Sequence, residues 1–333
     1  MTTTRSVSLI VLCVCLLLAY RVAGQQCKNV RVANIKSIFA IAPSPAASNV
    51  LFYGSAEKAE GEIVTGSLFR LRLAGGEIGV MQLKAPDASN PPTPVWKPDG
   101  SSAYFETDQG IYQLSSVAGS PELLWKGASA GLAISPDGLL LAFWRIDKGA
   151  DTLVLYDLNK KSEVRSWSVP DRFESDKSGW DIAFAPGGHA LYARTYDQTS
   201  STPLKLFDIG SGNVTVMNPS SYAVAGGNKA LYFIAASGTA RSLYKITADA
   251  RSSVVAKEFG YDSLTGSGKP RWLVSQDHRT KEMAVLDTET DAIKPIGKHE
   301  FATMLSDGTL LRVRGAEITI GDSTCRPTCT QRP

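Results

Sequence analysis

Residues 131–144 read Gly-Leu-Ala-Ile-Ser-Pro-Asp-Gly-Leu-Leu-Leu-Ala-Phe-Trp, with the tetrapeptide Ser135-Pro136-Asp137-Gly138 at the centre. Small and apolar residues lead into this tetrapeptide, and an apolar run follows it. Proline fixes φ at the first corner of a turn, an Asp side chain can accept a hydrogen bond from the nearby backbone, and Gly adopts positive φ at low cost. The stretch therefore predicts a tight turn between two β-strands.

The same hairpin pattern recurs along the whole chain. Its equivalent positions, from close copies to degenerate ones, are Pro98, Pro136, Pro186, Gly226, Ser306, Pro43 and Gly266. In chain order they are 55, 38, 50, 40, 40 and 40 residues apart. A period near 40 with several short strands in each repeat is typical of a β-propeller. After residue 24 no apolar run keeps a 3.6-residue period, so the pattern disfavours helical repeats.

Six of the repeats each contain four strand-like runs, whereas the last repeat has only three, at 302–305, 310–313 and 317–320. Lys28–Ile35, before the first repeat, alternates like a strand but has no blade of its own. We predict that it completes the last blade, because ring closure removes an exposed sheet edge. The predicted fold is all-β, a seven-bladed β-propeller of four-stranded antiparallel blades closed by the N-terminal strand. Six or eight blades are the less favoured alternatives.

These hairpins, with their small-apolar and aromatic rhythm, resemble the TolB-type propeller repeats, which are WD-like repeats with a Pro-Asp-Gly turn. The copies at 98, 136 and 186 match closely and the other four loosely. The resemblance extends over nearly all of the chain after the leader, and it implies a fold rather than an activity. TolB itself has six blades and an N-terminal α/β domain. We expect seven blades here and no such domain, so TolB's partners are not carried over.

Residues 1–24 are predicted to be a secretory signal peptide. Arg5 precedes an apolar run from Val7 to Tyr20, and Val22-Ala23-Gly24 offers small residues for cleavage. The expected organisation is a signal peptide at 1–24, a propeller at 25–322 and a C-terminal tail at 323–333. We expect a secreted or otherwise extracytoplasmic protein, in a periplasm or outside a cell, with no membrane span after cleavage.

After removal of the leader, the chain is almost neutral, with 33 basic and 32 acidic side chains. Nucleic acid is therefore not an expected partner, since it selects a basic surface. The sequence does not identify the protein or small-molecule ligand that would bind, and we expect a monomer. His189, His278 and His299 do not have the spacing of metal ligands, so we expect no metal and no cofactor.

Three cysteines remain after the leader, and they lie at the two ends of the chain, at Cys27, Cys325 and Cys329. In a secreted protein such cysteines are read first as disulfide partners. If Lys28–Ile35 pairs antiparallel with the strand that ends near Ile320, Cys27 can meet Cys325 or, after a short turn, Cys329. We favour Cys325, which requires less reach from the tail.

Loop lengths suggest where a binding site lies. The first-to-second and third-to-fourth strand turns are short, and we expect Asp99, Asp137 and Asp307 to cap such turns before Gly100, Gly138 and Gly308. The long connections, Ser55–Gly66, Asp171–Gly179 and Asp197–Pro203, all fall on the opposite face. Functional loops gather in this way on rigid scaffolds, although surface loops also tolerate insertions without any function. The residues predicted near this face are Arg145, Arg172, Trp180, Asp181, Arg194, Tyr196, Asp277 and His278.

Two functions fit these observations. The favoured one is a non-catalytic propeller that binds a protein or small ligand on the long-loop face. The alternative is a propeller enzyme, a lyase, lactonase or hydrolase with a carboxylate or metal site at the channel mouth. Most first strands begin with residues that have no ionisable side chain, and Asp181 and Asp262 are the exceptions. Three or more ionisable side chains converging at the channel mouth would favour the enzyme.

Overall fold

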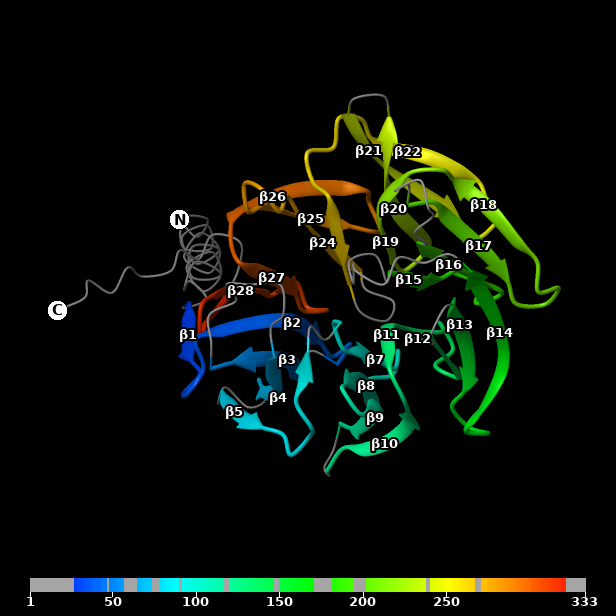
Figure 1. The fold of residues 1–333 in the computed structure, drawn as a ribbon. Helices are drawn as coiled ribbons and strands as arrows, with labels where there is room; N and C mark the ends of the chain where they lie inside the picture. Colours follow the sequence, from blue (N-terminus) through cyan, green and yellow to red (C-terminus); the bar gives the residue numbers. More distant parts are fainter. Residues whose placement is uncertain are drawn as a thin grey trace, which may run out of the picture.

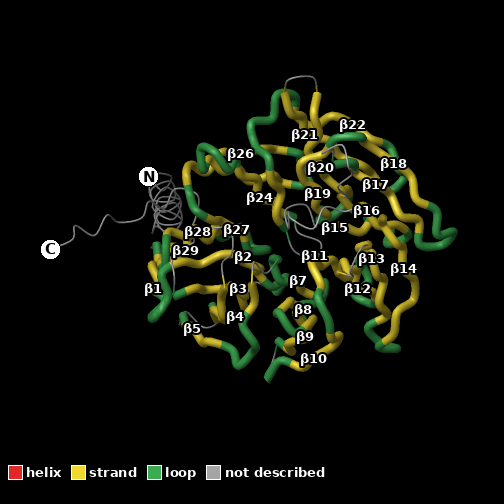
Figure 2. Tube along the Cα trace, in the orientation of Figure 1, coloured by secondary structure: helices red, strands yellow, loops and turns green. Residues whose placement is uncertain are grey.

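The computed structural model describes residues 27–46, 48–56, 65–73, 78–89, 92–116, 120–146, 150–170, 181–194, 202–237, 240–266 and 271–321. The predicted signal peptide and C-terminal tail, with Cys325 and Cys329, lie outside these ranges. Every regular element within them is a β-strand, as Figure 2 shows. None of the described residues forms a helix with the length and hydropathy needed to cross a membrane.

The strands form seven antiparallel sheets arranged in a ring (Figure 1). Each sheet is one blade of a β-propeller, so the predicted seven-bladed fold is confirmed. Blade 1 has β2 (Ser37–Pro43), β3 (Asn49–Ser55), β4 (Thr65–Arg72) and β5 (Gly79–Gln82), and the short β6 (Ala88–Ser89) also pairs with β4. Blade 2 has β7 (Val95–Trp96), β8 (Ser102–Thr107), β9 (Gly110–Ser115) and β10 (Glu122–Lys126). Blade 3 has β11 (Ser129–Ile134), β12 (Leu140–Ile146), β13 (Ala150–Asp157) and β14 (Ser162–Pro170).

The other four blades follow the same order, from the innermost strand outward. Blade 4 has β15 (Ile182–Phe184), β16 (Ala190–Arg194), β17 (Leu204–Asp208) and β18 (Val214–Asn218); blade 5 has β19 (Ser221–Gly226), β20 (Ala230–Ser237), β21 (Ala240–Thr247) and β22 (Ser252–Ala256); blade 6 has β23 (Ser263–Thr265), β24 (Trp272–Gln276), β25 (Glu282–Asp287) and β26 (Ala292–Lys298); and blade 7 has β27 (Phe301–Met304), β28 (Leu310–Arg314), β29 (Glu317–Gly321) and β1 (Lys28–Arg31).

The N-terminal strand closes the ring. β1 pairs antiparallel with β29, with Lys28 opposite Ile320 and Arg31 opposite Glu317. Just beyond β1, the Val32 amide donates to the Ala316 carbonyl at 3.0 Å. Strands from the two ends of the chain therefore form one sheet, as predicted, and they lie together in Figure 1.

Packing between blades supplies the core. The buried apolar residues of the described chain form seven clusters, each shared by two neighbouring blades. Tyr104 of blade 2 and Phe143 of blade 3, for example, belong to one cluster. The second strands lie between neighbouring blades and are almost entirely buried, and β8 has no exposed residue. A strand buried on both faces has a continuous apolar sequence, which explains the run at 141–144.

Two innermost strands are shorter than the sequence indicates. The residue pattern indicates strands at 93–97 and 261–265, but β7 covers only Val95–Trp96 and β23 only Ser263–Thr265. Pro94 directly precedes β7 and has no backbone N–H to extend the ladder. Elsewhere near the axis, β2, β11 and β19 each contain a register shift of the bulge type.

The Pro-Asp-Gly turn has the hydrogen bonds that its residues allow. Gly138 N donates to the Ser135 carbonyl at 2.9 Å, and Leu139 N donates to Asp137 Oδ1 at 3.0 Å. Asp99 and Asp307 make the corresponding bonds to the amides two residues on, each at 2.9 Å. Gly100, Gly138 and Gly308 have φ of 71°, 74° and 87°. These residues shape hairpins on the face that bears the short turns.

The turns of adjacent blades also touch. A Cβ at Gly138 would lie 3.2 Å from Cδ of Pro98, in the turn of the preceding blade. Gly188 is placed in the same way against Pro136, at 3.6 Å. A glycine in these turns therefore serves both the backbone conformation and the approach of the next blade.

The Gly138→Val variant tests this double constraint. A β-branched side chain at φ 74° is strained and would press on Pro98, so we expect a loss of about 1–3 kcal/mol in unfolding free energy. Urea denaturation of both proteins measures it. Gly79→Val is the matched control, because a Cβ there meets nothing within 4 Å and φ is ordinary. Equal stability of the Gly138→Val and parent proteins would contradict this reading of the turn.

The closing strand leads to a disulfide prediction. Cys27 directly precedes Lys28, which lies opposite Ile320, so residues 325 and 329 are a few residues beyond the partner strand. We expect a Cys27–Cys325 bridge, which closes a loop of roughly 300 residues and would stabilise the fold by about 5 kcal/mol in the chain-entropy treatment. Peptide mapping under non-reducing conditions identifies the pair. A linked peptide with Cys325 joined to Cys329 would contradict the prediction, and Cys329→Ser should leave the bridge intact.

Candidate functional site

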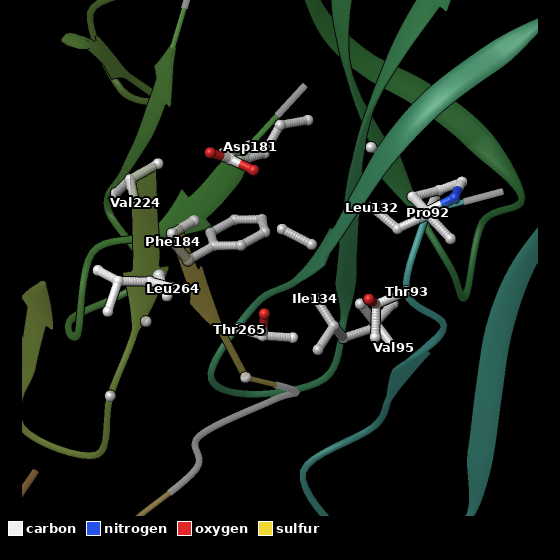
Figure 3. Close-up of a pocket in the computed structure, with 18 of the residues that line it drawn as sticks. Pro92, Thr93, Val95, Leu132, Ile134, Asp181, Phe184, Val224, Leu264 and Thr265 are labelled. Atoms are coloured by element: carbon white, nitrogen blue, oxygen red, sulfur yellow. The ribbon is translucent and has the colours of Figure 1, made fainter. Parts of the chain in front are cut away.

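A cavity of about 200 Å³ lies inside the ring, between the innermost strands of blades 2 to 6. Its walls are mostly apolar side chains and glycine backbone. Figure 3 shows Phe184 and Leu264 on one side and Leu132 and Ile134 on the other. Asp181, at the start of the innermost strand of blade 4, is the ionisable side chain among the described residues that line the cavity.

Asp181 is engaged by an arginine from the next strand. Arg194 Nη1 donates to Asp181 Oδ2 at 2.8 Å, and the Arg194 amide donates to the Asp181 carbonyl at 3.2 Å. The Arg194 side chain is 10% exposed and the Asp181 side chain 35%. Arg194 Nε is buried and has no hydrogen-bond acceptor among the described residues. The ion pair holds the Asp181 carboxylate at the cavity wall, and the Arg194 guanidinium covers one side of that carboxylate.

A second polar group lies on the long-loop face across blades 5 and 6. We call it the Arg241 cluster, and it consists of Tyr222, Arg241, Asp262 and His278. The Arg241 guanidinium lies over the Tyr222 ring, 4.7 Å from its centroid, and Nη1 is 3.7 Å from Asp262 Oδ2. His278 Nδ1 is 2.6 Å from Asp262 Oδ1. A single carboxylate thus links a cation from blade 5 with an imidazole from blade 6.

Exposure in the Arg241 cluster increases from the carboxylate outward. The Asp262 side chain is 16% exposed, the Arg241 side chain 26% and the His278 side chain 61%. Tyr222 is 38% exposed, whereas Tyr53, Tyr104, Tyr192 and Tyr232 on other described strands are fully buried. The cluster therefore presents an aromatic face, a guanidinium and an imidazole to solvent, and Asp262 contacts both the guanidinium and the imidazole.

Two neighbours of the cluster have displaced pKa values. Burial raises the pKa of the Tyr261 hydroxyl, and the charges of Glu282 and Asp277 add to the effect. The pKa of Asp277 is lowered, mainly by the hydrogen bond from the Arg279 amide. Tyr261 therefore stays neutral and Asp277 stays ionised at neutral pH.

The structure separates the predicted site residues into three groups. Asp181 and Arg194 meet at the cavity, and His278 joins Asp262 on the long-loop face. Asp277 instead caps its own turn, where it accepts from Arg279 N and Thr280 Oγ1, each at 2.9 Å. Arg145 extends to the outer strand of its blade and pairs with Glu163 at 3.2 Å. Arg172, Trp180 and Tyr196 lie outside the described residues, as do most of the three long connections.

Sequence reasoning missed Tyr222 and Arg241. Both are second residues of strands, in β19 and β21, at the ends that face the long loops. A search for aromatic and basic residues at those strand ends, rather than inside long loops, could have found them. Among the described residues, no three His, Cys, Asp or Glu side chains are placed to hold a metal ion.

The Asp181→Asn variant tests the ion pair at the cavity. The amide keeps the shape but removes the charge next to the nearly buried Arg194, so we expect a loss of about 1–2 kcal/mol in unfolding free energy. Glu163→Gln is the control, since its pair with Arg145 is more exposed and should contribute less than about 1 kcal/mol. Urea denaturation compares the two, and equal effects would contradict a special role for the cavity pair.

Comparison with solved structures places the fold. No protein-family model matches the chain, and no curated protein matches it in sequence. The chain is similar to U3-55K, with a TM-score of 0.58 and 12% identity over 88% of this chain and 97% of that one. It is also similar to a chain of hydrazine synthase from Kuenenia stuttgartiensis, with a TM-score of 0.57 and 14% identity over 90% and 97%.

TolB from Acinetobacter baumannii also matches, with a TM-score of 0.49 and 16% identity over 88% of this chain and 66% of that one. At such identities, a match in structure shows a shared fold and carries no statement about activity. The propeller fold that the Pro-Asp-Gly hairpins imply is confirmed by the seven blades of the structure, and the matches with a TM-score above 0.5 agree with it.

Proposed function

We propose that this chain is a secreted, non-catalytic propeller that binds a protein or small ligand on its long-loop face. Propellers provide a rigid scaffold on which binding residues are carried by the connections between strands. The observation that carries the proposal is the Arg241 cluster, where Tyr222 and Arg241 are partly exposed and already fixed in position. Tyr and Arg are enriched among the residues that dominate binding energy at interfaces.

Fixed geometry matters for affinity. A long arginine side chain loses rotamer freedom when it is immobilised at an interface, which weakens binding. Arg241 is already held by the Tyr222 ring and the Asp262 carboxylate, so much of this cost is met on folding. The cavity lined by blades 2 to 6 lies inside the same ring, and it offers an inserted group both apolar side chains and polar groups, Asp181 among them.

Secretion is supported by the composition of residues 1–24 and by the cysteines at the chain ends. The apolar run after Arg5 and the small residues before Gln25 have the pattern of a cleaved leader. Cys27 lies at the closing strand of the ring, where a bridge to the tail would join the two ends.

One observation favours the alternative function. His278, Asp262 and Arg241 are three ionisable groups that converge on the long-loop face. An imidazole oriented by a carboxylate through Nδ1 is the arrangement used by general bases in hydrolases. The test is hydrolysis of an ester or a lactone by the parent protein. Loss of this activity in both His278→Gln and Asp262→Asn, with each variant still folded, would favour the enzyme.

Two matched arginine variants test the binding proposal. Arg271 lies over the Trp272 ring at 4.6 Å on the short-turn face, so Arg271→Ala removes a comparable contact from the opposite side. Partners are first captured with the mature parent chain. Their affinity is then measured for the parent, for Arg241→Ala and for Arg271→Ala. We expect Arg241→Ala to weaken binding by about thirtyfold, as the loss of a hot-spot residue of roughly 2 kcal/mol would.

The control separates the two faces. Arg271→Ala should leave the affinity unchanged, and Tyr222→Ala should reproduce the loss seen with Arg241→Ala. A partner that loses affinity only with Arg271→Ala, or with neither variant, would contradict binding through the Arg241 cluster. Circular dichroism of each variant confirms that the fold is intact.

A further inference from the structure

The sequence contains one acceptor triplet for N-linked glycosylation, Asn213-Val214-Thr215. Asn218-Pro219-Ser220 comes close, but proline at the middle position excludes it. The triplet takes no part in the binding proposal, because it lies in the turn between β17 and β18 on the short-turn face.

The structure presents this asparagine at a fixed, exposed position. Asn213 and Thr215 are both exposed. The backbone carbonyl of Asn213 accepts a hydrogen bond from Asp208 N at 2.9 Å, and the backbone N–H of Asn213 donates to Ser211 Oγ at 3.2 Å. Trp167 of the neighbouring blade donates to the Gly212 carbonyl at 2.9 Å. Hydrogen bonds therefore hold the backbone of this turn, while the side chain of Asn213 faces solvent.

The strand that follows the turn is an apolar edge. β18 is the outermost strand of blade 4, and Val214, Val216 and Met217 are 48%, 58% and 36% exposed. β18 has no charged side chain, whereas the outermost strand of blade 3 carries Glu163 and Arg165. Uncharged apolar edges can pair with other chains, and proteins normally cover or charge them.

We infer that Asn213 carries an N-linked glycan, whose bulk covers the exposed edge of β18. The sugar joins the chain at the residue directly before the strand, so it lies beside Val214 and Val216. A glycan is large and strongly hydrated, so it would hinder the approach of a second chain. The inference rests on the secretory route of the proposed function, since only a chain that enters a glycosylating compartment is modified.

The experiment uses the full chain, with its own leader, expressed in eukaryotic cells. We expect the protein in the medium to carry one glycan that peptide N-glycosidase F removes, with conversion of Asn213 to Asp in the mass spectrum. Thr215→Ser keeps the acceptor hydroxyl and should retain the glycan. Thr215→Val keeps the shape of the side chain and should lose it.

The covering role has its own measurement. Asn213→Gln, secreted without the glycan, should self-associate, and its mass by light scattering should rise toward that of a dimer at concentrations where the glycosylated protein is monomeric. A secreted chain without modification at Asn213 would overturn the inference and leave secretion standing. A chain that stays in the cytosol would overturn both. An unmodified, monomeric Asn213→Gln protein would overturn the covering role, and none of these results depends on the binding of a partner.

Discussion

The pairing of β1 with β29 is the interaction on which the rest of the ring depends. A single blade exposes two apolar sheet faces, and it buries both only between two neighbours. Without β1, β29 would end the sheet of blade 7 with an open edge. β1 covers that edge, and Val32 just beyond it joins Ile318 and Phe52 in the cluster between blades 7 and 1. This one pairing therefore completes the last blade and the last interface at the same time.

Ring closure also determines which side chains meet on the long-loop face. In each blade the start of the innermost strand lies beside the end of the second strand. In blade 4 this register brings Asp181 beside Arg194, and in blade 6 it brings Asp262 beside His278. The topology thus brings together two side chains in each of these blades. One is an acidic residue at or just before the start of the first strand, and the other is a basic residue at or just after the end of the second strand. The Arg241 cluster adds a partner from blade 5, so it depends on packing between blades as well.

The strong parts of the sequence prediction rest on short turn motifs and on the number of strands in each repeat. The Pro-Asp-Gly turns specify hairpins through three adjacent residues. The strand at Lys28–Ile35 belongs to no repeat, and the last repeat lacks a fourth strand, so the two together indicate ring closure. The pairs within one blade were also within reach, because Asp181 and Arg194 are linked by a short hairpin. Arg145 shows the limit: it is the last residue but one of β12, in a place similar to that of Arg194 at the end of β16, but its guanidinium pairs outward with Glu163. No acid stands at the start of β11 to draw it toward the channel.

Contacts between blades were beyond the sequence pattern. Arg241 meets Tyr222 within blade 5, but its carboxylate partner Asp262 comes from blade 6. The offset between two blades is set by many apolar side chains in the cluster between them, and no short motif encodes it. Strand ends could therefore be assigned to a face from the sequence, while the particular partners on that face could not.

Neighbouring blades also meet through polar groups and turns, and these contacts differ around the ring. In blades 2 to 4 the Pro-Asp-Gly and Pro-Gly-Gly turns pack on one another, with Gly138 against Pro98 and Gly188 against Pro136. Between blades 5 and 6 a polar contact joins strands β20 and β21 to the turn between β25 and β26. The Tyr232 hydroxyl lies 2.8 Å from Asp291 Oδ1, and Lys245 pairs with the same carboxylate. Burial and the hydrogen bond to Asp291 raise the pKa of Tyr232, so its hydroxyl remains a donor. A buried tyrosine and an ion pair therefore join these two blades, in addition to the apolar cluster that the blades share.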